Sequence, residues 1–527
     1  MKFAFLSMSR TKDLGKRVAI IGAGPAGLSV TGYLVTRGFE VDVYEKLPLP
    51  GGLMTFAIPS NKIDVNGILE GCKDLEQNFG VKFYFKTKVA SGRGVETGDE
   101  FVEKVIDFYD IIKKYDAVVV ATGTWESKKL NIPGENAANV IPALELLYRI
   151  RLSELGYTSN IKLPNRVIIV GGGLSAVDAV EECLNRGVKE VYWIYRRTAK
   201  EAPAGIYNIN RLVNRGVKFL ELTQPIEILT ENNVVKAVKL VKMKFEGTDE
   251  SGRPKPVPVP GSEFVLETDM VITAIGEKPT PPIGVGDLAK YVGDDGRLLV
   301  DLSYRVPGTS VFAAGDVVQG PTKIGLAVDH GLKVARSLDK LVSGSAPKIA
   351  EMIASLPKAR YIASYTKWAD AIGKSTCGFL ATRLGIEEGK CLSGKPFLKI
   401  IDYNKCIGCE TCSAICGFLH DGKPLIKIEK TEDGVVIPIT CMHCTNAKCA
   451  EACKRKAIVR GSMKEVLIDY SKCNNCLDCV YACPIRAIRI RGGRAVNCDL
   501  CKALREHGLP PACISMCPSN AIMLYAT

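Results

Sequence analysis

Sixteen of the twenty cysteines in this 527-residue chain lie between residues 406 and 517, in four consecutive groups of four. The first and third groups have the spacing C-x2-C-x2-C-x3-C, whereas the second widens the middle gap to four residues and the fourth to eleven. Three cysteines on a tight loop and a fourth at the start of the next helix can hold [4Fe–4S] clusters in pairs, because the fourth cysteine binds the other cluster of its pair. The sequence therefore predicts four [4Fe–4S] clusters and a protein that carries electrons. The quartets are Cys406, Cys409, Cys412, Cys416; Cys441, Cys444, Cys449, Cys453; Cys473, Cys476, Cys479, Cys483; and Cys498, Cys501, Cys513, Cys517.

Two other uses of these cysteines fit less well. Disulfides need an oxidising compartment, but the apolar run at residues 1–6 is too short for a signal peptide and carries no twin arginine. We therefore expect a cytoplasmic protein with reduced thiols. Zinc ribbons use two C-x2-C pairs about 15 to 20 residues apart, which would leave half of each quartet without a role. The four isolated cysteines, expected to pack in apolar cores, are Cys72, Cys183, Cys377 and Cys391.

Composition and charge narrow the classes of partner. With 46% apolar and 24% charged residues, the chain fits a globular protein with large cores, and no stretch approaches a membrane span. The net charge of +13 counts the sixteen cysteines as neutral. Each all-thiolate cluster carries about two negative charges, which would bring the loaded protein to about +5. Basic residues are scattered rather than arranged in a stripe, so we expect no nucleic-acid partner.

A dinucleotide fingerprint begins near residue 17. The apolar strand 18–21 is followed by the turn Gly22-Ala23-Gly24-Pro25-Ala26-Gly27, a helical run, and a strand at 41–44 that ends in Glu45. Gly22 allows the tight turn, Gly24 lets the backbone approach a diphosphate, and Gly27 lets the helix pack on the strand. The helix N-terminus then offers amides to the phosphates, and Glu45 stands where an acid accepts ribose hydroxyls.

A second fingerprint follows about 150 residues later, so two dinucleotides are expected. Strand 167–170 precedes Gly171-Gly172-Gly173-Leu174-Ser175-Ala176, and strand 191–195 ends in Arg196 and Arg197 where the first fingerprint has an acid. Guanidinium groups in place of the ribose-binding acid favour a 2′-phosphate, hence NADP(H) over NAD(H). Solvated surface arginines are the alternative reading.

Two nested units in this order resemble the FAD/NAD(P)-dependent flavoprotein disulfide reductase superfamily. Residues 118–123 look like its strand beside FAD, 273–279 like its crossing near the nicotinamide, and 311–316 like its closing FAD motif, with Asp316 at the ribityl chain. Other segments are specifically similar to the glutamate synthase small subunit and its relatives, the flavin subunits of ferredoxin:NADP transhydrogenase and sulfide dehydrogenase. Those segments are 51–53, 58–59, 195–197 and 256–264.

The resemblance covers residues 17 to about 345 and implies the cofactor contacts. It assigns no acid–base side chain, because hydride transfer takes place at FAD N5. Members usually carry an N-terminal cysteine-rich domain, so with sixteen residues before the first strand the electron exit is expected elsewhere. The redox-active cysteine pair is also missing between Glu45 and Ser60. The implied FAD residues are Gly22, Gly24, Pro25, Ala26, Gly27, Glu45, Lys46, Gly52, Leu53, Val89, Ala121, Thr122, Gly123, Gly315 and Asp316. The implied NAD(P) residues are Gly171, Gly173, Leu174, Ser175, Ala176, Arg196, Arg197, Ile275 and Gly276.

The C-terminal part resembles the four-cluster ferredoxin subunits of the dimethylsulfoxide-reductase type. Similar polyferredoxins accompany tungsten or molybdenum aldehyde oxidoreductases and carbon monoxide dehydrogenase. In that family the outer two motifs exchange their last cysteines, as do the inner two. Gly417 and Lys454 replace the usual proline after the fourth cysteine, and His420, His443 and His507 are expected to hydrogen-bond or face solvent rather than ligate. The implied clusters are Cys406/Cys409/Cys412/Cys517, Cys441/Cys444/Cys449/Cys483, Cys473/Cys476/Cys479/Cys453 and Cys498/Cys501/Cys513/Cys416.

The predicted fold is α/β, with two nested Rossmann-like domains of the flavoprotein disulfide reductase type, a helical linker and an α+β ferredoxin-like four-cluster domain. The FAD domain is expected at 17–130 and 280–345, and the NAD(P)H domain at 131–279. The linker is expected at 346–396, with helices at 348–356 and 362–373, and the cluster domain at 397–527.

The predicted function is that of an FAD-dependent NAD(P)H:iron–sulfur oxidoreductase within a multi-subunit complex. Electrons would pass between NAD(P)(H), FAD and four clusters, to or from a redox partner protein. The resemblance implies a tungsten or molybdenum aldehyde oxidoreductase as partner, with a carbon monoxide dehydrogenase type subunit next. The alternatives are a free-standing NAD(P)H:ferredoxin oxidoreductase and a non-catalytic assembly or storage subunit.

Overall fold

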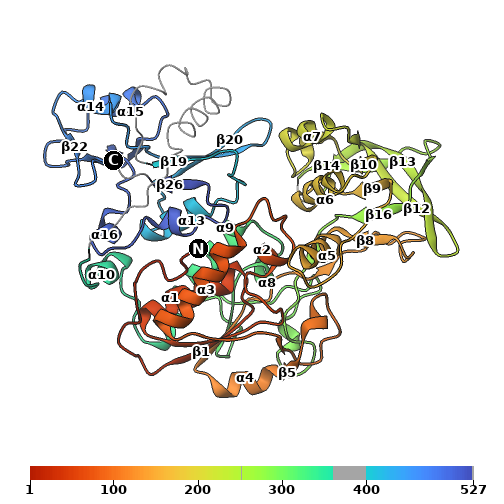
Figure 1. Cartoon of the computed structure of the whole chain (residues 1–527), viewed down its shortest axis with the longest axis horizontal. Helices are drawn as coiled ribbons and strands as arrows, with labels where there is room; N and C mark the ends of the chain where they lie inside the picture. The colour runs from red at the N-terminus through yellow and green to blue at the C-terminus, as the bar shows by residue number, and fades with distance from the viewer. Residues whose placement is uncertain (251, 360–398, 525–527) are drawn as a thin grey trace.

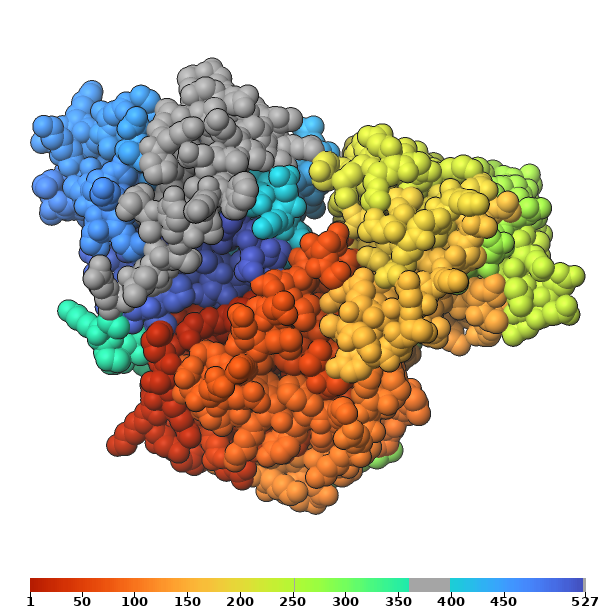
Figure 2. All heavy atoms as spheres, viewed as in Figure 1, coloured from red at the N-terminus to blue at the C-terminus, as the bar shows by residue number. Residues whose placement is uncertain are grey.

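The computed structural model describes residues 1–250, 252–359 and 399–524. Three domains can be followed in Figure 1: an α/β domain at the bottom, a second α/β domain at the right and a cysteine-rich domain at the upper left. We call them the flavin, nucleotide and cluster domains after their predicted ligands. Figure 2 shows the flavin domain, in red and orange, in contact with both of the others. None of the described helices combines the length and the apolar character that a membrane span requires.

The flavin domain is built on a five-stranded parallel sheet with the order β18-β6-β1-β2-β3. Its central strands are runs of Val, Ile and Ala buried on both faces, as a sheet covered on both sides requires. Helices α1 and α9 pack against each other over one face. The main elements are β1 (Arg17–Ile21), α1 (Pro25–Arg37), β2 (Glu40–Tyr44), α2 (Leu53–Phe56), α3 (Val65–Phe79), β3 (Lys82–Tyr84), β4 (Thr87–Val89), β5 (Lys104–Ile106), α4 (Phe108–Lys114), β6 (Ala117–Val120), β18 (Val311–Ala313), α8 (Asp316–Gln319), α9 (Ile324–Val342) and α10 (Ile349–Ala354).

The nucleotide domain repeats this arrangement with the sheet order β11-β10-β9-β16-β8 and adds an antiparallel sheet of four strands. Strands β7 (Glu126–Ser127) and β17 (Glu277–Lys278) pair with each other where the chain enters and leaves the domain. The main elements are β8 (Val140–Pro142), α5 (Ala143–Glu154), β9 (Arg166–Val170), α6 (Leu174–Asn185), β10 (Glu190–Ile194), α7 (Ile206–Val213), β11 (Lys218–Leu220), β12 (Thr223–Glu231), β13 (Val234–Thr248), β14 (Pro254–Pro258), β15 (Phe264–Glu267) and β16 (Met270–Thr273).

The cluster domain alternates short helices with two-stranded antiparallel hairpins, and its ends are tied together by β19 and β26. The two-nested-domain fold followed by a cluster domain is therefore confirmed. Its elements are β19 (Lys399–Ile401), α13 (Thr411–Leu419), β20 (Lys427–Lys430), β21 (Val436–Ile439), α14 (Lys448–Glu451), β22 (Ile458–Arg460), β23 (Val466–Ile468), α15 (Asp478–Ala482), β24 (Arg489–Arg491), β25 (Arg494–Val496), α16 (Lys502–Arg505), α17 (Ala512–Ser515) and β26 (Ile522–Leu524).

One apolar core runs from the flavin-domain sheet into the cluster domain, whereas the nucleotide domain has cores of its own. The N-terminal residues Phe3 to Leu6 are buried in the shared core, and the ring of Phe5 meets that of Phe418 edge-on at 6.1 Å between centroids. The backbone also crosses this contact, since Lys2 N donates to Ser515 O at 2.9 Å. The flavin and cluster domains therefore form one packed body.

Some of the remaining sequence predictions concern described residues, and others concern residues outside the described ranges. Cys72 and Cys183 are buried, as expected. The first linker helix is confirmed as α10. The second, at 362–373, lies outside the described residues, as do Cys377 and Cys391.

Candidate functional site

A large cleft opens at the carboxyl edge of the flavin-domain sheet and reaches both other domains. Most of the predicted dinucleotide-binding residues line it, including residues from both fingerprints. Seven others, Gly27, Gly171, Ala176, Arg196, Arg197, Ile275 and Gly315, do not line it. The predicted residues that do are Gly22, Gly24, Pro25, Ala26, Glu45, Lys46, Gly52, Leu53, Val89, Ala121, Thr122, Gly123, Gly173, Leu174, Ser175, Gly276 and Asp316.

The first glycine turn has the close approaches that a dinucleotide fingerprint requires. Gly22 has φ +104°, and a Cβ there would lie 2.4 Å from Ala121 O. A Cβ at Gly27 would lie 2.0 Å from Gly22 O, whereas one at Gly24 would meet nothing within 4 Å. Gly24 thus leaves open space in front of the N-terminus of α1, whose amides and dipole favour a diphosphate.

Glu45 closes this turn from the end of β2. One carboxylate oxygen accepts from Ala23 N at 2.7 Å and the other from Leu47 N at 3.0 Å. Burial raises the pKa of Glu45, while these two backbone donors oppose the rise. A carboxylate has further lone pairs, so Glu45 can still accept a ribose hydroxyl.

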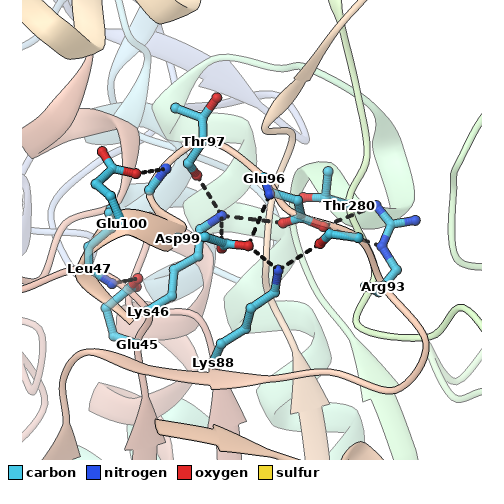
Figure 3. A network of polar contacts seen from close by, with 12 residues as sticks. Glu45, Lys46, Leu47, Lys88, Arg93, Glu96, Thr97, Asp99, Glu100 and Thr280 are labelled. Carbon is cyan, nitrogen blue, oxygen red and sulfur yellow. Dashed lines mark hydrogen bonds and ion pairs between the residues drawn. The ribbon is translucent and has the colours of Figure 1, made fainter. Parts of the chain in front are cut away.

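Lys46 is held by a network around the loop at 93–100, shown in Figure 3. Its Nζ donates to Thr97 O at 2.7 Å and pairs with Glu96 at 3.3 Å, and it lies 4.8 Å from the ring centre of Trp125. Lys88 joins the network through Asp99. The ammonium of Lys46 therefore fixes the wall of the cleft.

Features at the flavin end of the cleft fit a bound FAD. The hydroxyl of Thr122 is buried without a hydrogen-bond partner among the described residues, which suits a polar ligand atom. Asp316 accepts from Thr322 Oγ1 at 2.6 Å, and burial raises its pKa to about 6. The buried His330 accepts Gly315 N–H on Nδ1 at 2.8 Å, and burial lowers its pKa to about 4. His330 is thus neutral at pH 7 and secures the closing motif.

The second glycine turn is shaped like the first. A Cβ at Gly171 would lie 2.0 Å from Ala274 O, and one at Gly173, which precedes α6, would meet nothing within 4 Å. The N-terminus of α6 therefore faces open space in the cleft, as a second diphosphate site needs. Trp193 donates its indole N–H to Gly171 O at 2.6 Å and fixes the turn.

The two arginines after β10 differ in their environment. Arg197 is buried, pairs with Asp249 at 2.5 Å and donates to Pro254 O at 3.0 Å. Arg196 is exposed and has no ion-pair partner among the described residues. Arg196 is therefore the guanidinium that is free to meet a 2′-phosphate.

Sequence reasoning missed a set of charges where the flavin and nucleotide domains face each other across the cleft. Lys62, shortly after α2, pairs with Asp178 and Glu181 on α6, both at 2.5 Å. Arg211 on α7 pairs with Glu181 as well. The partners of Lys62 lie over a hundred positions away in sequence, so no local pattern could have indicated this contact.

The cysteines of the cluster domain surround separate sites instead of forming compact ion-binding groups. Among the described residues no three His, Cys, Asp or Glu side chains lie as ligands of one metal ion would. Instead, four cysteines from the outer motifs line one cavity, which we call site I, and another four line a second cavity, site IV. Cysteines spread around a cavity suit a polynuclear cluster. Site I consists of Cys406, Cys409, Cys412 and Cys517, and site IV consists of Cys498, Cys501, Cys513 and Cys416.

In the inner two motifs, the last cysteine of each lies among the thiols of the other. Burial and the nearby thiols of Cys441, Cys483 and Cys449 raise the pKa of Cys444 to about 12. Burial and the thiols of Cys453, Cys473 and Cys476 likewise raise the pKa of Cys479 to about 11. Loading iron must displace these protons. We call Cys441, Cys444, Cys449 and Cys483 site II, and Cys473, Cys476, Cys479 and Cys453 site III.

A repeated loop holds the fourth cysteine of three motifs. In each, the residue three positions on has a left-handed backbone, and the N–H four positions on donates to the cysteine Sγ at 3.2–3.3 Å. Lys454 keeps this loop although it replaces proline. After Cys416 the chain differs, because α13 continues through Gly417 and the donor is Leu425 N, at 3.1 Å.

The three histidines near the quartets are not needed as ligands. His443 is buried and accepts Val466 N–H on Nδ1 at 3.1 Å, and His507 Nδ1 lies 3.2 Å from Pro357 O. His420 lines the cavity of site IV, where burial lowers its pKa. A residue that sequence reasoning missed, Lys399, also lines this cavity.

Site I adjoins the flavin cleft. Cys406 and Cys409 line the cleft as well as their own cavity. Gly325, in the first turn of α9, donates its N–H to Cys409 O at 3.0 Å, and Lys323 pairs with Glu410 at 2.6 Å. A Cβ at Gly325 would lie 2.4 Å from Cys409 O, so only glycine allows this approach. One cleft therefore joins both glycine turns to the first cysteine loop.

Comparison with known families gives two matches. A family described as "Pyridine nucleotide-disulphide oxidoreductase" matches residues 16–331, and a "4Fe-4S dicluster domain" matches residues 433–526. The first contains both glycine turns. The second contains the last three cysteine motifs.

The curated relatives match somewhat under two thirds of the chain at moderate identity. The NADP(+)-dependent formate dehydrogenase subunit beta of Moorella thermoacetica is 36% identical over 332 residues, which is 62% of this chain and 44% of that protein. The glutamate synthase [NADPH] small chain of Escherichia coli is 30% identical over 339 residues, 62% of this chain and 69% of that one. The chain spans about half the length of the first relatives it matches.

Among solved structures, FprA of Mycobacterium tuberculosis in complex with NADPH aligns with a TM-score of 0.50 at 20% identity. The alignment covers 64% of this chain and 89% of that one. This likeness concerns the fold of the two α/β domains.

Proposed function

Because the chain belongs to the pyridine nucleotide-disulphide oxidoreductase family, we propose that it is an NAD(P)H-dependent electron-transfer subunit with FAD and four [4Fe–4S] clusters. The observation that carries this proposal is the shared cleft, in which Cys406 and Cys409 stand with both glycine turns. A nicotinamide, a flavin and an iron–sulfur cluster could therefore be adjacent without a dithiol between them.

The residues of the chain would bind and orient, while the cofactors supply the chemistry. When bound, FAD exchanges a hydride with the nicotinamide and single electrons with a neighbouring cluster. The N-termini of α1 and α6 would hold the two diphosphates, and Thr122 and Asp316 would bind polar atoms of FAD. The sixteen cysteines would ligate clusters at sites I to IV, with the exchanged pairing described above.

We favour NADP(H) over NAD(H). Support comes from the exposed, unpaired Arg196 at the end of β10 and from relatives whose names specify NADP(+) or NADPH. Arg197 supports the site indirectly, since its pairing with Asp249 fixes the loop that carries Arg196.

The partner that we propose is a tungsten or molybdenum aldehyde oxidoreductase, with a carbon monoxide dehydrogenase type subunit next, on the resemblance of the cysteine motifs alone. Names of relatives such as "subunit beta" and "small chain" support a complex with a second redox protein. A free-standing NAD(P)H:ferredoxin oxidoreductase is the alternative. We place the reaction in the cytoplasm, where thiols stay reduced.

Anaerobic stopped-flow mixing of the reconstituted protein with NADPH tests the core of this proposal. Preparations with about sixteen irons per chain should lose flavin absorbance first and cluster absorbance next. Clusters that stay oxidised after full flavin reduction would contradict it, and no spectral change with either nicotinamide would favour a non-catalytic subunit. Anaerobic pulldown with metal analysis distinguishes the partners. Tungsten or molybdenum would indicate the aldehyde oxidoreductase, nickel the carbon monoxide dehydrogenase type subunit, and none of these metals the free-standing enzyme.

A further inference from the structure

The four cysteine sites follow one another in space in the order I, IV, II, III, which differs from their order in sequence. Site IV adjoins site I, because Cys412 of site I and Cys416 of site IV lie one turn apart on α13. Asn497, beside Cys498 of site IV, approaches Cys441 Sγ of site II at 4.0 Å.

Site III lies beyond site II and ends this series. Cys449 of site II lies on α14 and Cys479 of site III lies on α15. Helix α14 packs on α15, and both lie on the side of the cluster domain away from the flavin domain (Figure 1). Site I touches the flavin cleft, so site III is the opposite end of the electron path.

Site III is also where the path reaches the surface. Of the sixteen cysteines, all of which lie within the described residues, Cys476 alone is exposed. Tyr481, between the last two cysteines of the third motif, is 81% exposed. Large aromatic rings such as that of Tyr481 are typical of the centre of a protein–protein contact. Here the ring belongs to the same cysteine motif as the solvent-accessible cluster ligand Cys476.

A run of three cations stands next to these groups. Lys454, Arg455 and Lys456 follow Cys453 directly, all three are exposed, and none pairs with a described carboxylate. The loop that carries them wraps Cys453, whose Sγ accepts the N–H of the next residue, Ala457, at 3.2 Å. In the second and third motifs, 441–453 and 473–483, Asp478 at the start of α15 is the one carboxylate without an ion-pair partner among the described residues.

The wider segment around these three cations also carries net positive charge. Residues 441–497 hold eleven Lys and Arg against four Asp and Glu, of which Glu465 is buried against Arg505. Two oxidised clusters at sites II and III would remove about four positive charges and leave an excess. The segment that supplies the inner two cysteine motifs therefore carries net positive charge even with both clusters bound.

We propose that this surface, which we call the exit face (Lys454, Arg455, Lys456, Cys476 and Tyr481), docks a small acidic protein that carries one electron at a time. The proposal rests on the electron path of the proposed function and, of the partners considered there, favours the ferredoxin of the alternative over the aldehyde oxidoreductase. Opposite charge steers such a carrier to the face, and contact at Tyr481 places its redox centre near site III. NADPH and two oxidised carriers would give NADP+, a proton and two reduced carriers.

The test uses the holoprotein and a small acidic ferredoxin as the probe. In the double variant Lys454→Glu/Arg455→Glu, Lys456 is left in place because its backbone is left-handed, with φ 49°. The matched control is Lys104→Glu/Lys114→Glu, two exposed, unpaired lysines of the flavin domain that undergo the same charge change. Ferredoxin reduction by NADPH is followed against ferredoxin concentration at low salt and at about 0.5 M salt.

At low salt the exit-face variant should raise the KM for ferredoxin about tenfold or more, and the difference should vanish at high salt. The control variant and the NADPH-driven reduction of the internal clusters should be unchanged. An unaltered KM and salt dependence, or an equal change in the control, would overturn the proposal. The proposal would also be overturned if the exit-face variant lost binding to duplex DNA or anionic vesicles while its kinetics with ferredoxin stayed unchanged.

An experiment with protein whose clusters are reduced by dithionite tests the docking proposal independently of the proposed function. Electron transfer from pre-reduced clusters to ferredoxin does not involve the flavin, so the effect of the exit-face variant should persist there. If NADPH fails to reduce the clusters while this salt-dependent effect remains, the proposed function fails and the docking surface stands.

Discussion

Lys399 is a buried cation whose balancing charge comes from cysteines. It is completely buried, and its Nζ donates to Thr440 Oγ1 at 3.1 Å and to Cys498 Sγ at 3.4 Å. No described carboxylate pairs with it. Burial opposes the charged form, but the thiols of site IV raise the pKa of Lys399 above its usual value. An ammonium so placed stabilises the more negative, reduced state of a cluster at site IV.

Replacing Lys399→Met should therefore lower the reduction potential of one cluster. We expect at least a tenfold change in the ratio of reduced to oxidised cluster, about 59 mV for a one-electron couple. EPR-monitored redox titration measures it. Lys405→Met, an exposed lysine beside Cys406, is the matched control and should change little. Equal shifts in both variants, or none in either at full iron content, would refute the role of Lys399.

Arg196 should decide the preference between the two nicotinamide coenzymes. Loss of one charge-assisted contact to a 2′-phosphate costs about 1.5–3 kcal/mol, so Arg196→Ala should raise the KM for NADPH about tenfold to a hundredfold. The KM for NADH should not change. Steady-state kinetics with both coenzymes checks this, with the neighbouring exposed Lys200→Ala as control. Parallel losses for NADPH and NADH would show that Arg196 only stabilises the loop.

Local patterns were enough to predict the glycine turns and the cysteine motifs, because each depends on residues close in sequence. The partner of Arg197 could not be predicted, since Asp249 lies 52 positions away. The same holds for Lys399, whose sulfur partner lies 99 positions away. The burial of Phe3 and Phe5 between two domains could not be predicted either, because so short an apolar run shows no periodic pattern.

The contact between α9 and the first cysteine loop fixes the position of site I against the flavin cleft. The Gly325 Cα faces the loop so closely that an added Cβ would lie 2.4 Å from Cys409 O and 2.5 Å from Thr411 N. Both neighbours are backbone atoms inside a cysteine motif, so they cannot turn aside as a side chain would. Any side chain at Gly325 must push the loop away from the flavin cleft.

Gly325→Ala should therefore uncouple the clusters from the flavin. Because a displacement of about 1 Å can cost a hundredfold in rate, we expect cluster reduction to slow about tenfold to a hundredfold, with flavin reduction by NADPH unchanged. Stopped-flow absorbance separates the two phases. Lys340→Ala, exposed on the same helix, serves as control. Normal cluster reduction in Gly325→Ala would show that electrons leave the flavin by another path.

The packing divides the whole molecule into two bodies. The flavin and cluster domains form one, and the nucleotide domain, which is attached more loosely, forms the other. The flavin and cluster domains share one core, and residues 3–6 are packed within it. The nucleotide domain touches the rest through β7 and β17, the Lys62 ion pairs and a backbone bond from Tyr207 N to Asp433 O at 2.9 Å. Its helix α5 also packs on α2 in two small apolar clusters, and Arg151 Nε donates to Thr55 O at 3.0 Å. These clusters are far smaller than the core that the flavin and cluster domains share, and limited inter-domain contacts permit relative movement. Hydride delivery can thus involve motion of the nucleotide domain while the spacing of flavin and site I stays fixed.

This division predicts two thermal transitions. The nucleotide domain should unfold first, and flavin release and cluster loss should then coincide, because both follow from rupture of one core. NADP+, which cannot reduce the flavin, should raise only the first transition, by about 2.7 kcal/mol at a hundred times its Kd. Calorimetry at a fixed scan rate, with flavin fluorescence and cluster absorbance recorded in parallel, resolves the order. Cluster loss well below flavin release would mean that the shared core does not hold the two domains together.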